Sequence, residues 1–518
     1  MTPKASVPAS TPASTLASTP ASTLADLGAG AVVIALIFAL QFALTDSSRS
    51  LGRPLWTDEL ISFSQTLAIG EGLSEGLRTL ARSPDLTPPG YHLLLAGWVS
   101  LIGEEPTATA LRLSSLLWVF LGLVASYGLL RRSFATLPAA TGVAAIWASS
   151  EVVGYAFELR GYAAWFGLQA CFCLLLALAN DARHRRVAQI LLAPCAALLC
   201  TVHYFGVLTL ALSLAGWALV ELRRGRRAPL AAWPASLGLL ALAACLPTMF
   251  QQIAVLSEPT WLGVRSLRQE LAFISFFIAQ PVLVVIAAFA LAWALGRESS
   301  QEGEGTRWAQ RPSGLAAMLA IALLPVVLVL FGRLHEPVAI ARYAFPATLA
   351  GGPVVALLVG RMPRMLAGVC LVLTLGVSTV ELDYKARTSG SLASQQQVTL
   401  ALLQRHTGED VIAFEQFHDI APLLWLDRSL TDRLFYLDVD EASNRHERYL
   451  TGFVLAGLDS WGWPRRLGAE DLRGLDRLFL VSAGRLPGAA FIRTGQFEIE
   501  QVGGQLWRLR RSAPISSR

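Results

Sequence analysis

Two adjacent carboxylates, Asp58 and Glu59, follow the first long apolar segment of this 518-residue chain. Ionisable groups beside a membrane surface are costly unless they are solvated or used, and a carboxylate can take the proton from an attacking hydroxyl as a general base. A third acid, Asp85, precedes paired prolines that fix the backbone ahead of a short helix. The ordinary alternatives are a polar loop for the first pair and a helix-start signal around Asp85.

Cations and aromatic rings recur in three later motifs, Glu158-Leu159-Arg160-Gly161-Tyr162, His203-Tyr204 and Arg342-Tyr343. The planar guanidinium of arginine suits a phosphate because it donates two parallel hydrogen bonds. An arginine beside a tyrosine is also a common anchor at the membrane interface, and a single histidine at a helix end is more often structural. Together, however, acids, arginines and a histidine beside a bilayer would serve a lipid-phosphate substrate, because arginines can neutralise a departing phosphate.

The composition indicates that these motifs stand between membrane spans. Hydrophobic residues make up 54% of the chain and charged residues only 15%, against roughly 25% charged residues in soluble domains. The apolar residues form blocks long enough to cross a bilayer. The net charge of +5 does not indicate nucleic acid, because the arginines gather in short connectors between blocks. All six cysteines lie in apolar blocks, so no disulfide framework is predicted.

We predict eleven spans, at residues 28–45, 109–131, 137–152, 162–180, 187–202, 205–222, 230–250, 271–295, 313–332, 343–360 and 364–381. This number brings every basic connector to one side, which the positive-inside rule makes cytoplasmic. The N-terminus would then be cytoplasmic, and all of the motifs above would lie on the outer side.

Three regions follow from this division. Residues 1–27 are a low-complexity tail rich in Ala, Ser, Thr and Pro and are predicted to be disordered. Residues 28–381 form an all-α membrane domain whose long first outer loop, 46–108, holds a short interfacial or re-entrant helix near 91–102. Residues 382–518 mix strand-like and helix-like runs and are predicted to form a small soluble α/β domain on the outer side.

The order of the motifs resembles the GT-C superfold of membrane glycosyltransferases. Trp-x-Asp-Glu, Asp-x-x-Pro-Pro-x-Tyr, Arg-x-Tyr, His-Tyr and Arg-Tyr-x-x-Pro follow one another as in the dolichyl-phosphate-mannose protein mannosyltransferase and aminoarabinose transferase family. The likeness covers about residues 28–381. One departure is Thr87, which stands where many relatives carry a histidine before the proline pair.

The resemblance implies an inverting transfer of a sugar from a polyprenyl-phosphate donor to an acceptor hydroxyl on the extracytoplasmic face. It implies Asp58 as general base, Glu59 as its support, and Asp85 in the same cavity, binding the acceptor or a metal. The residues it implies at the donor phosphate are Arg160, Tyr162, His203, Arg342 and Tyr343.

The expected partners are the bilayer, a polyprenyl-phosphate sugar, and an acceptor that is a protein, a glycolipid or a polysaccharide. Asp58, Glu59 and Asp85 would offer oxygen ligands to a divalent metal ion, although no cofactor is certain. Likeness and composition indicate a bacterial inner membrane, with the C-terminal domain in the periplasm.

A transporter or flippase of lipid-linked sugars is the main alternative. Such proteins often have two related halves and broken helices, and no repeat is evident in this sequence. A polymerase or ligase using a diphosphate-linked lipid would carry its arginines in a large late loop, whereas here the acids come early. A membrane scaffold would give Asp58 and Glu59 no role.

Overall fold

The computed structural model describes residues 21–83, 86–103, 105–225, 229–255, 266–278, 286, 289, 313–334, 340–408, 410–414, 420–430, 432–437, 465–467, 475–481, 497–503 and 505–511. Several predicted features lie partly or wholly outside these residues, among them Asp85, most of the tail 1–27, most of the span 271–295 and parts of the C-terminal region 382–518.

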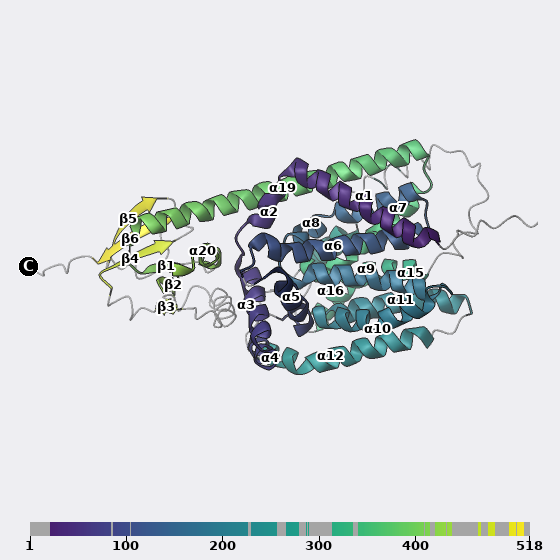
Figure 1. Cartoon of the computed structure of the whole chain (residues 1–518), viewed down its shortest axis with the longest axis horizontal. Helices are drawn as coiled ribbons and strands as arrows, with labels where there is room; N and C mark the ends of the chain where they lie inside the picture. The colour runs from purple at the N-terminus through teal and green to yellow at the C-terminus, as the bar shows by residue number, and fades with distance from the viewer. Residues whose placement is uncertain are drawn as a thin grey trace, which may run out of the picture.

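Long apolar helices form the body of the protein (Figure 1). In the part of the chain that is described, nine segments are long and apolar enough to cross a membrane. They comprise α1 (Ala21–Thr45), α6 (Ala108–Arg131), α9 (Gly161–Ala179), α10 (Arg185–Val202), α11 (Gly206–Arg223), α12 (Pro229–Val255), α15 to α16 (Ser313–Leu334), α17 to α18 (Ala341–Val359) and α19 (Arg364–His406). The chain is thus an integral membrane protein.

The predicted total of eleven spans is not established. Nine predicted spans coincide with these segments. The predicted span 137–152 is a shorter helix, α7 (Thr136–Trp147), followed by α8 (Ser150–Ala156). At 271–295, the described residues include only α13 (Leu267–Ile278) and the isolated residues 286 and 289.

Small residues allow the helices of the bundle to pack closely. A Cβ on Gly142 of α7 would lie 2.5 Å from the carbonyl oxygen of Gly352 in α18, and one on Gly167 of α9 would lie 2.5 Å from that of Trp118 in α6. Glycine at such crossings lets two backbones approach, as is common between membrane helices. These contacts join α7 to α18 and α9 to α6.

The loop between α1 and α6 folds into short helices, α2 (Ser48–Gly52), α3 (Thr57–Glu71), α4 (Leu73–Arg82) and α5 (Pro89–Ile102). The helix predicted near 91–102 is therefore present, and it starts with a proline, whose missing N–H is tolerated in a first turn. Helices α3 and α4 lie across one end of the bundle (Figure 1). Several charged residues of the candidate site lie at this end.

In the described part of the C-terminal region, six strands form a mixed sheet in the order β3-β2-β1-β4-β6-β5. Its strands are β1 (Ile412–Phe414), β2 (Leu434–Leu437), β3 (Arg465–Leu467), β4 (Arg477–Val481), β5 (Phe497–Gly503) and β6 (Leu506–Arg511). Strands β1 to β4 pair in parallel, whereas β6 runs antiparallel to β4 and β5. The predicted α/β region is confirmed.

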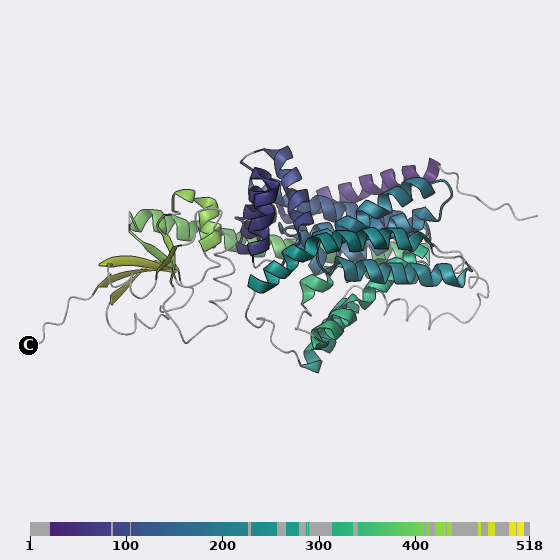
Figure 2. The same cartoon turned by 90° about the horizontal axis from the view of Figure 1, so that it is seen from below.

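Helix α19 connects the bundle to this sheet without a break. Its 43 residues extend over ~65 Å at 1.5 Å per residue, about twice the ~30 Å hydrocarbon core of a bilayer. The boundary predicted at residue 382 falls within this helix. The sheet and the start of α1 lie at opposite ends of the bundle (Figures 1 and 2).

Polar contacts tie several helix ends together at the end of the bundle away from the sheet. Arg132 and His184 contact Asp181 at 2.9 and 3.1 Å, and Asn180 donates to Ser313 at 2.7 Å and to Glu221 at 3.3 Å. Three of the arginine-containing connectors between predicted spans, those near residues 131, 184 and 224, therefore meet at one end.

Candidate active site

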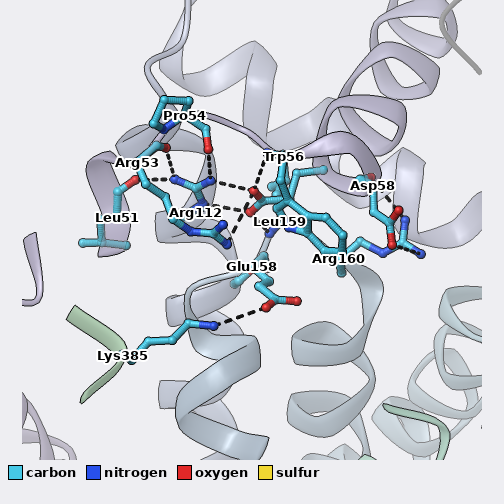
Figure 3. Close-up of polar contacts among 12 residues, drawn as sticks. Leu51, Arg53, Pro54, Trp56, Asp58, Arg112, Glu158, Leu159, Arg160 and Lys385 are labelled. Carbon is cyan, nitrogen blue, oxygen red and sulfur yellow. Dashed lines mark hydrogen bonds and ion pairs between the residues drawn. The ribbon is translucent and has the colours of Figure 1, made fainter. Parts of the chain in front are cut away.

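A buried ion pair anchors the start of α3 (Figure 3). Glu59 and Arg112 have no exposed side-chain surface. Arg112 donates from Nε to Glu59 Oε1 at 2.8 Å and from Nη2 to Oε2 at 2.6 Å, the bidentate geometry that makes such pairs strong. Its remaining donors bind the carbonyl oxygens of Leu51, Arg53 and Pro54. One arginine of α6 thus fixes the chain that leads into α3.

Glu59 also binds backbone on both sides of the site. It accepts from the N–H of Leu159 at 2.8 Å and from that of Trp56 at 3.2 Å. Burial alone would raise the pKa of Glu59, but the charges of Arg112 and Arg53 and the hydrogen bonds from Arg112 and the Leu159 N–H outweigh it and lower the pKa to about 2. Glu59 is therefore a permanent anion that holds two loops against each other.

The side chain of Asp58, the residue before Glu59, points away from the Glu59 side chain and lies near two arginines. Its Oδ2 is 4.0 Å from Arg160 Nη2 and 3.9 Å from Arg342 Nη1. These distances exceed those of a hydrogen bond. Its side chain is 20% exposed. The geometry brings a carboxylate and two guanidinium groups close together without a hydrogen bond between their side chains.

Arg160 is held in place by the start of α3. Its Nη1 donates to the carbonyl oxygen of Asp58 at 3.2 Å and to Ser62 Oγ at 3.1 Å. The residue precedes α9 in an extended conformation, and Glu59 binds the adjacent Leu159 N–H. Asp58 and Arg160 therefore keep their relative positions through one shared framework.

Aromatic rings lie beside the two arginines of the site. The guanidinium groups of Arg160 and Arg342 lie 5.9 and 5.4 Å from the ring centres of Tyr162 and Tyr343, within cation–π range. His203 lies 5.5 Å from Tyr162 and 5.8 Å from Tyr343 and stacks on Trp165 at 4.1 Å. His203 Nδ1 also accepts from the Phe205 N–H, so the imidazole is fixed in orientation.

Two contacts bring the C-terminal part of the chain to this end. Lys385 of α19 lies 3.3 Å from Glu158, just before Arg160 (Figure 3). Phe63 of α3 meets Trp425 of α20 (Ile420–Leu426) edge to face at 5.8 Å. Helix α20 thus packs on α3, which carries Asp58.

The structure brings most of the residues predicted at the site together in one cluster. Its members are Asp58, Arg160, Tyr162, His203, Arg342 and Tyr343. Glu59 is adjacent but turned into the protein, and Asp85 lies outside the described residues. The sequence reasoning missed Arg112 and Arg53. The signal for Arg112 was present, because it is a charged residue inside the predicted span 109–131.

The described residues around Asp58 offer few ligands to a divalent metal ion. The described residues contain no group of three or more His, Cys, Asp or Glu side chains that could hold one. Both oxygens of Glu59 already accept hydrogen bonds, from Arg112, Leu159 and Trp56. Glu59 could bind a metal only by giving up the contacts that order the site.

Comparison with known proteins bears on the fold. No protein-family model matches the chain, and no curated protein matches it in sequence. Two solved structures of ArnT from Cupriavidus metallidurans match over nearly the whole chain. The apo form has a TM-score of 0.58 at 14% identity and covers 93% of this chain and 98% of its own. The form bound to undecaprenyl phosphate has a TM-score of 0.56 at 13% identity and covers 94% and 99%.

The chain has the GT-C fold. The likeness extends beyond the bundle, because coverage of more than nine-tenths of this chain includes residues of the C-terminal region. The resemblance drawn from the motifs is thereby confirmed at the level of the fold.

Proposed function

We propose that this protein is a membrane glycosyltransferase that moves a sugar from a polyprenyl-phosphate donor to an acceptor hydroxyl, with inversion, on the extracytoplasmic face of a bacterial inner membrane. The observation that carries the proposal is Asp58, whose carboxylate lies 4.0 and 3.9 Å from the guanidinium groups of Arg160 and Arg342. A base and a phosphate-neutralising pair in one place are what this reaction needs.

The reaction follows from these groups. Asp58 accepts the proton of the acceptor hydroxyl while that oxygen attacks the anomeric carbon of the sugar. The bond from this carbon to the phosphate oxygen breaks, and its electron pair leaves with the polyprenyl phosphate. Arg160 and Arg342 stabilise the negative charge that develops there. Because neither guanidinium group is at hydrogen-bond distance from the Asp58 carboxylate, binding of the donor phosphate does not have to break a hydrogen bond between an arginine and the base.

Glu59 and Arg112 have a positioning role in this scheme. Glu59 cannot serve as a base, because its buried oxygens accept hydrogen bonds from Arg112 and from two backbone N–H groups. It sets the start of α3 and the loop before Arg160, and therefore the spacing of Asp58 and Arg160. His203 and the tyrosines Tyr162 and Tyr343 form the wall on which the donor head would rest.

The nature of the donor is supported by the structural neighbour, which binds undecaprenyl phosphate. The acceptor would be a protein, a glycolipid or a polysaccharide that reaches the site beside α20 and α3. No step above requires a metal.

The test uses membranes that contain the wild-type chain, a panel of labelled polyprenyl-phosphate sugars and an acceptor extract. We expect transfer of label from one of these donors, and NMR of the product should show the opposite anomeric configuration to that of the donor. Retention of configuration would rule out the single displacement. Movement of an intact lipid-linked sugar across proteoliposomes, without transfer from any donor, would favour a flippase instead.

A further inference from the structure

Arg53 is a buried cation whose charge is only partly compensated. Glu59 carries one negative charge and engages Arg112 at 2.6 and 2.8 Å, whereas Arg53 Nη2 is 3.7 Å from Glu59 Oε2. Only 12% of the Arg53 side chain is exposed, and within the described part of the chain its buried Nε has no hydrogen-bond partner. Two guanidinium groups therefore lie beside the Glu59 carboxylate, and Arg53 is farther from it than Arg112 is.

The pKa of Arg53 agrees with this geometry. Burial lowers it, the charges of Glu59 and, more weakly, Glu158 raise it, and the neighbouring charge of Arg112 lowers it, so that the pKa lies below its ordinary value. A second anion near Arg53 would relieve this cost, since buried charges are stable when paired and hydrogen-bonded.

Arg53 lines a polar groove between α2 and α19. The groove has a volume of about 600 Å³ and is lined only by small or polar described residues, among them Arg49, Arg53, Ser391, Ser394 and Gln397. None of its described lining residues is acidic. Asp46 pairs with Arg49 at 2.6 Å but does not line the groove. Such a lining would favour an oxyanion over an apolar ligand.

The groove begins along α19 at about one membrane thickness from the start of that helix. Gly390, on its α19 side, comes 26 residues after Arg364, the first residue of that helix, a distance of ~39 Å at 1.5 Å per residue. This exceeds the ~30 Å hydrocarbon core and falls short of the ~40–45 Å that includes the headgroups. Helix α2, on the other side, begins just after α1 ends at Thr45.

We propose that the groove between α2 and α19 binds a phosphate group at the level of the lipid headgroups, with Arg53 and Arg49 as its cationic partners and the serine and glutamine side chains as hydrogen-bond donors. This site is separate from the cluster around Asp58, and the proposal does not depend on sugar transfer. The phosphate could belong to a phospholipid headgroup or come from solution.

The experiment measures binding of inorganic phosphate to the full chain in phosphatidylcholine nanodiscs, by the shift of its melting temperature. It is done in an Arg342→Gln background, so that phosphate held at the Asp58 cluster does not contribute. A second arm uses nanodiscs that contain phosphatidylglycerol and counts retained lipids by native mass spectrometry. The variants are Arg53→Gln, which removes the charge, and Gly390→Leu, which fills the groove without changing any charge.

Gly390→Leu fills the groove because a Cβ at position 390 would already lie 3.1 Å from Arg49 Cδ. The control is Arg78→Gln on α4, an arginine that is 68% exposed and paired with Glu75. Intrinsic fluorescence without ligand reports whether each variant is folded.

We expect phosphate to bind at least ~10-fold more weakly to Arg53→Gln and to Gly390→Leu, as loss of a charge-assisted contact implies, and equally well to Arg78→Gln. Retention of one fewer phosphatidylglycerol by the two groove variants would identify the headgroup as the source, whereas a phosphate effect alone would identify the soluble ion. Unchanged phosphate binding and lipid retention in both folded groove variants would overturn the proposal. That result would leave the proposed transferase untouched, because it concerns different residues.

Discussion

Replacing Glu59 by glutamine tests the framework that positions the site. The pKa of Glu59 is about 2, against an ordinary 4.5, and this difference corresponds to ~3 kcal/mol of folding free energy. Because the folded-state pKa is the lower one, this stabilisation is complete above about pH 4.5 and is lost as the pH falls towards 2. At neutral pH, Glu59→Gln removes it and leaves Arg112 buried without a counter-charge, which costs ~3–5 kcal/mol.

The assay is thermal unfolding in detergent, followed by the monomer peak that survives heating. One kcal/mol shifts the melting temperature by ~2–4 °C in chains of 150–250 residues and by less in a longer one, so we expect a fall of roughly 3–10 °C for Glu59→Gln. The double variant Glu59→Met, Arg112→Met removes both charges. It should be more stable than the sum of the single effects by ~1–3 kcal/mol.

Rescue by the double variant will be incomplete, because Arg112 also binds the carbonyl oxygens of Leu51, Arg53 and Pro54. A melting temperature of Glu59→Gln within about 1 °C of wild type would refute the reasoning, because it lies below the expected fall of roughly 3–10 °C. Additive single and double effects would refute the pairing of the two side chains.

Further predictions concern the contacts around Asp58. Arg160→Lys and Arg342→Lys keep the charge but lose the planar fork, so kcat/KM for the donor should fall ~10–100-fold in each, with the KM for the acceptor unchanged in initial-rate assays. Lys385→Met removes a contact whose side chains are 24% and 18% exposed; the stability should change by less than ~1 kcal/mol, and a larger change in melting would contradict a surface role. Trp425→Ala removes the edge contact of α20 with α3, worth ~0.5–1.5 kcal/mol, and should raise the KM for the acceptor more than that for the donor. Between pH 8 and 5, Glu59 stays ionised because its pKa is about 2. The pH dependence of the transfer rate over this range should therefore show no step that comes from protonation of Glu59.

Much of the site could be predicted because its residues flank apolar segments. Spans identified by length and apolarity place Asp58, Arg160, His203 and Arg342 at helix ends, and the alternation of basic connectors assigns those ends to one side. The fold then brings residues nearly 300 positions apart within about 4 Å, as with Asp58 and Arg342.

The separate roles of Asp58 and Glu59 could not be predicted from the sequence. They are neighbours in the chain, yet one faces Arg160 and Arg342 while the other is buried against Arg112. This difference depends on the direction of each side chain at the start of α3 and on a partner 53 residues away. Composition gives no sign of such a pairing.

The predicted domain boundary at residue 382 differs from the position at which helix α19 ends. Polar residues begin near residue 382 because the helix leaves the hydrocarbon, and this change of composition predicted the end of a domain. Yet α19 continues to His406, since a helix needs no apolar face once its surroundings are aqueous or partly covered. Helices across the end of the bundle, such as α3 and α4, were missed for the same reason, because their polar residues resemble those of a loop.

The central claim is that Asp58 accepts the proton of the acceptor hydroxyl. Its most direct test compares sugar transfer by wild type, Asp58→Asn and Asp383→Asn in membranes at equal expression. Asp383 is a matched control, because it is 39% exposed on α19 and pairs with Arg387. We predict that Asp58→Asn lowers kcat by roughly 100-fold or more, as expected for loss of a general base, while Asp383→Asn and the melting temperatures stay near wild type. Transfer by Asp58→Asn at the wild-type rate would contradict the account.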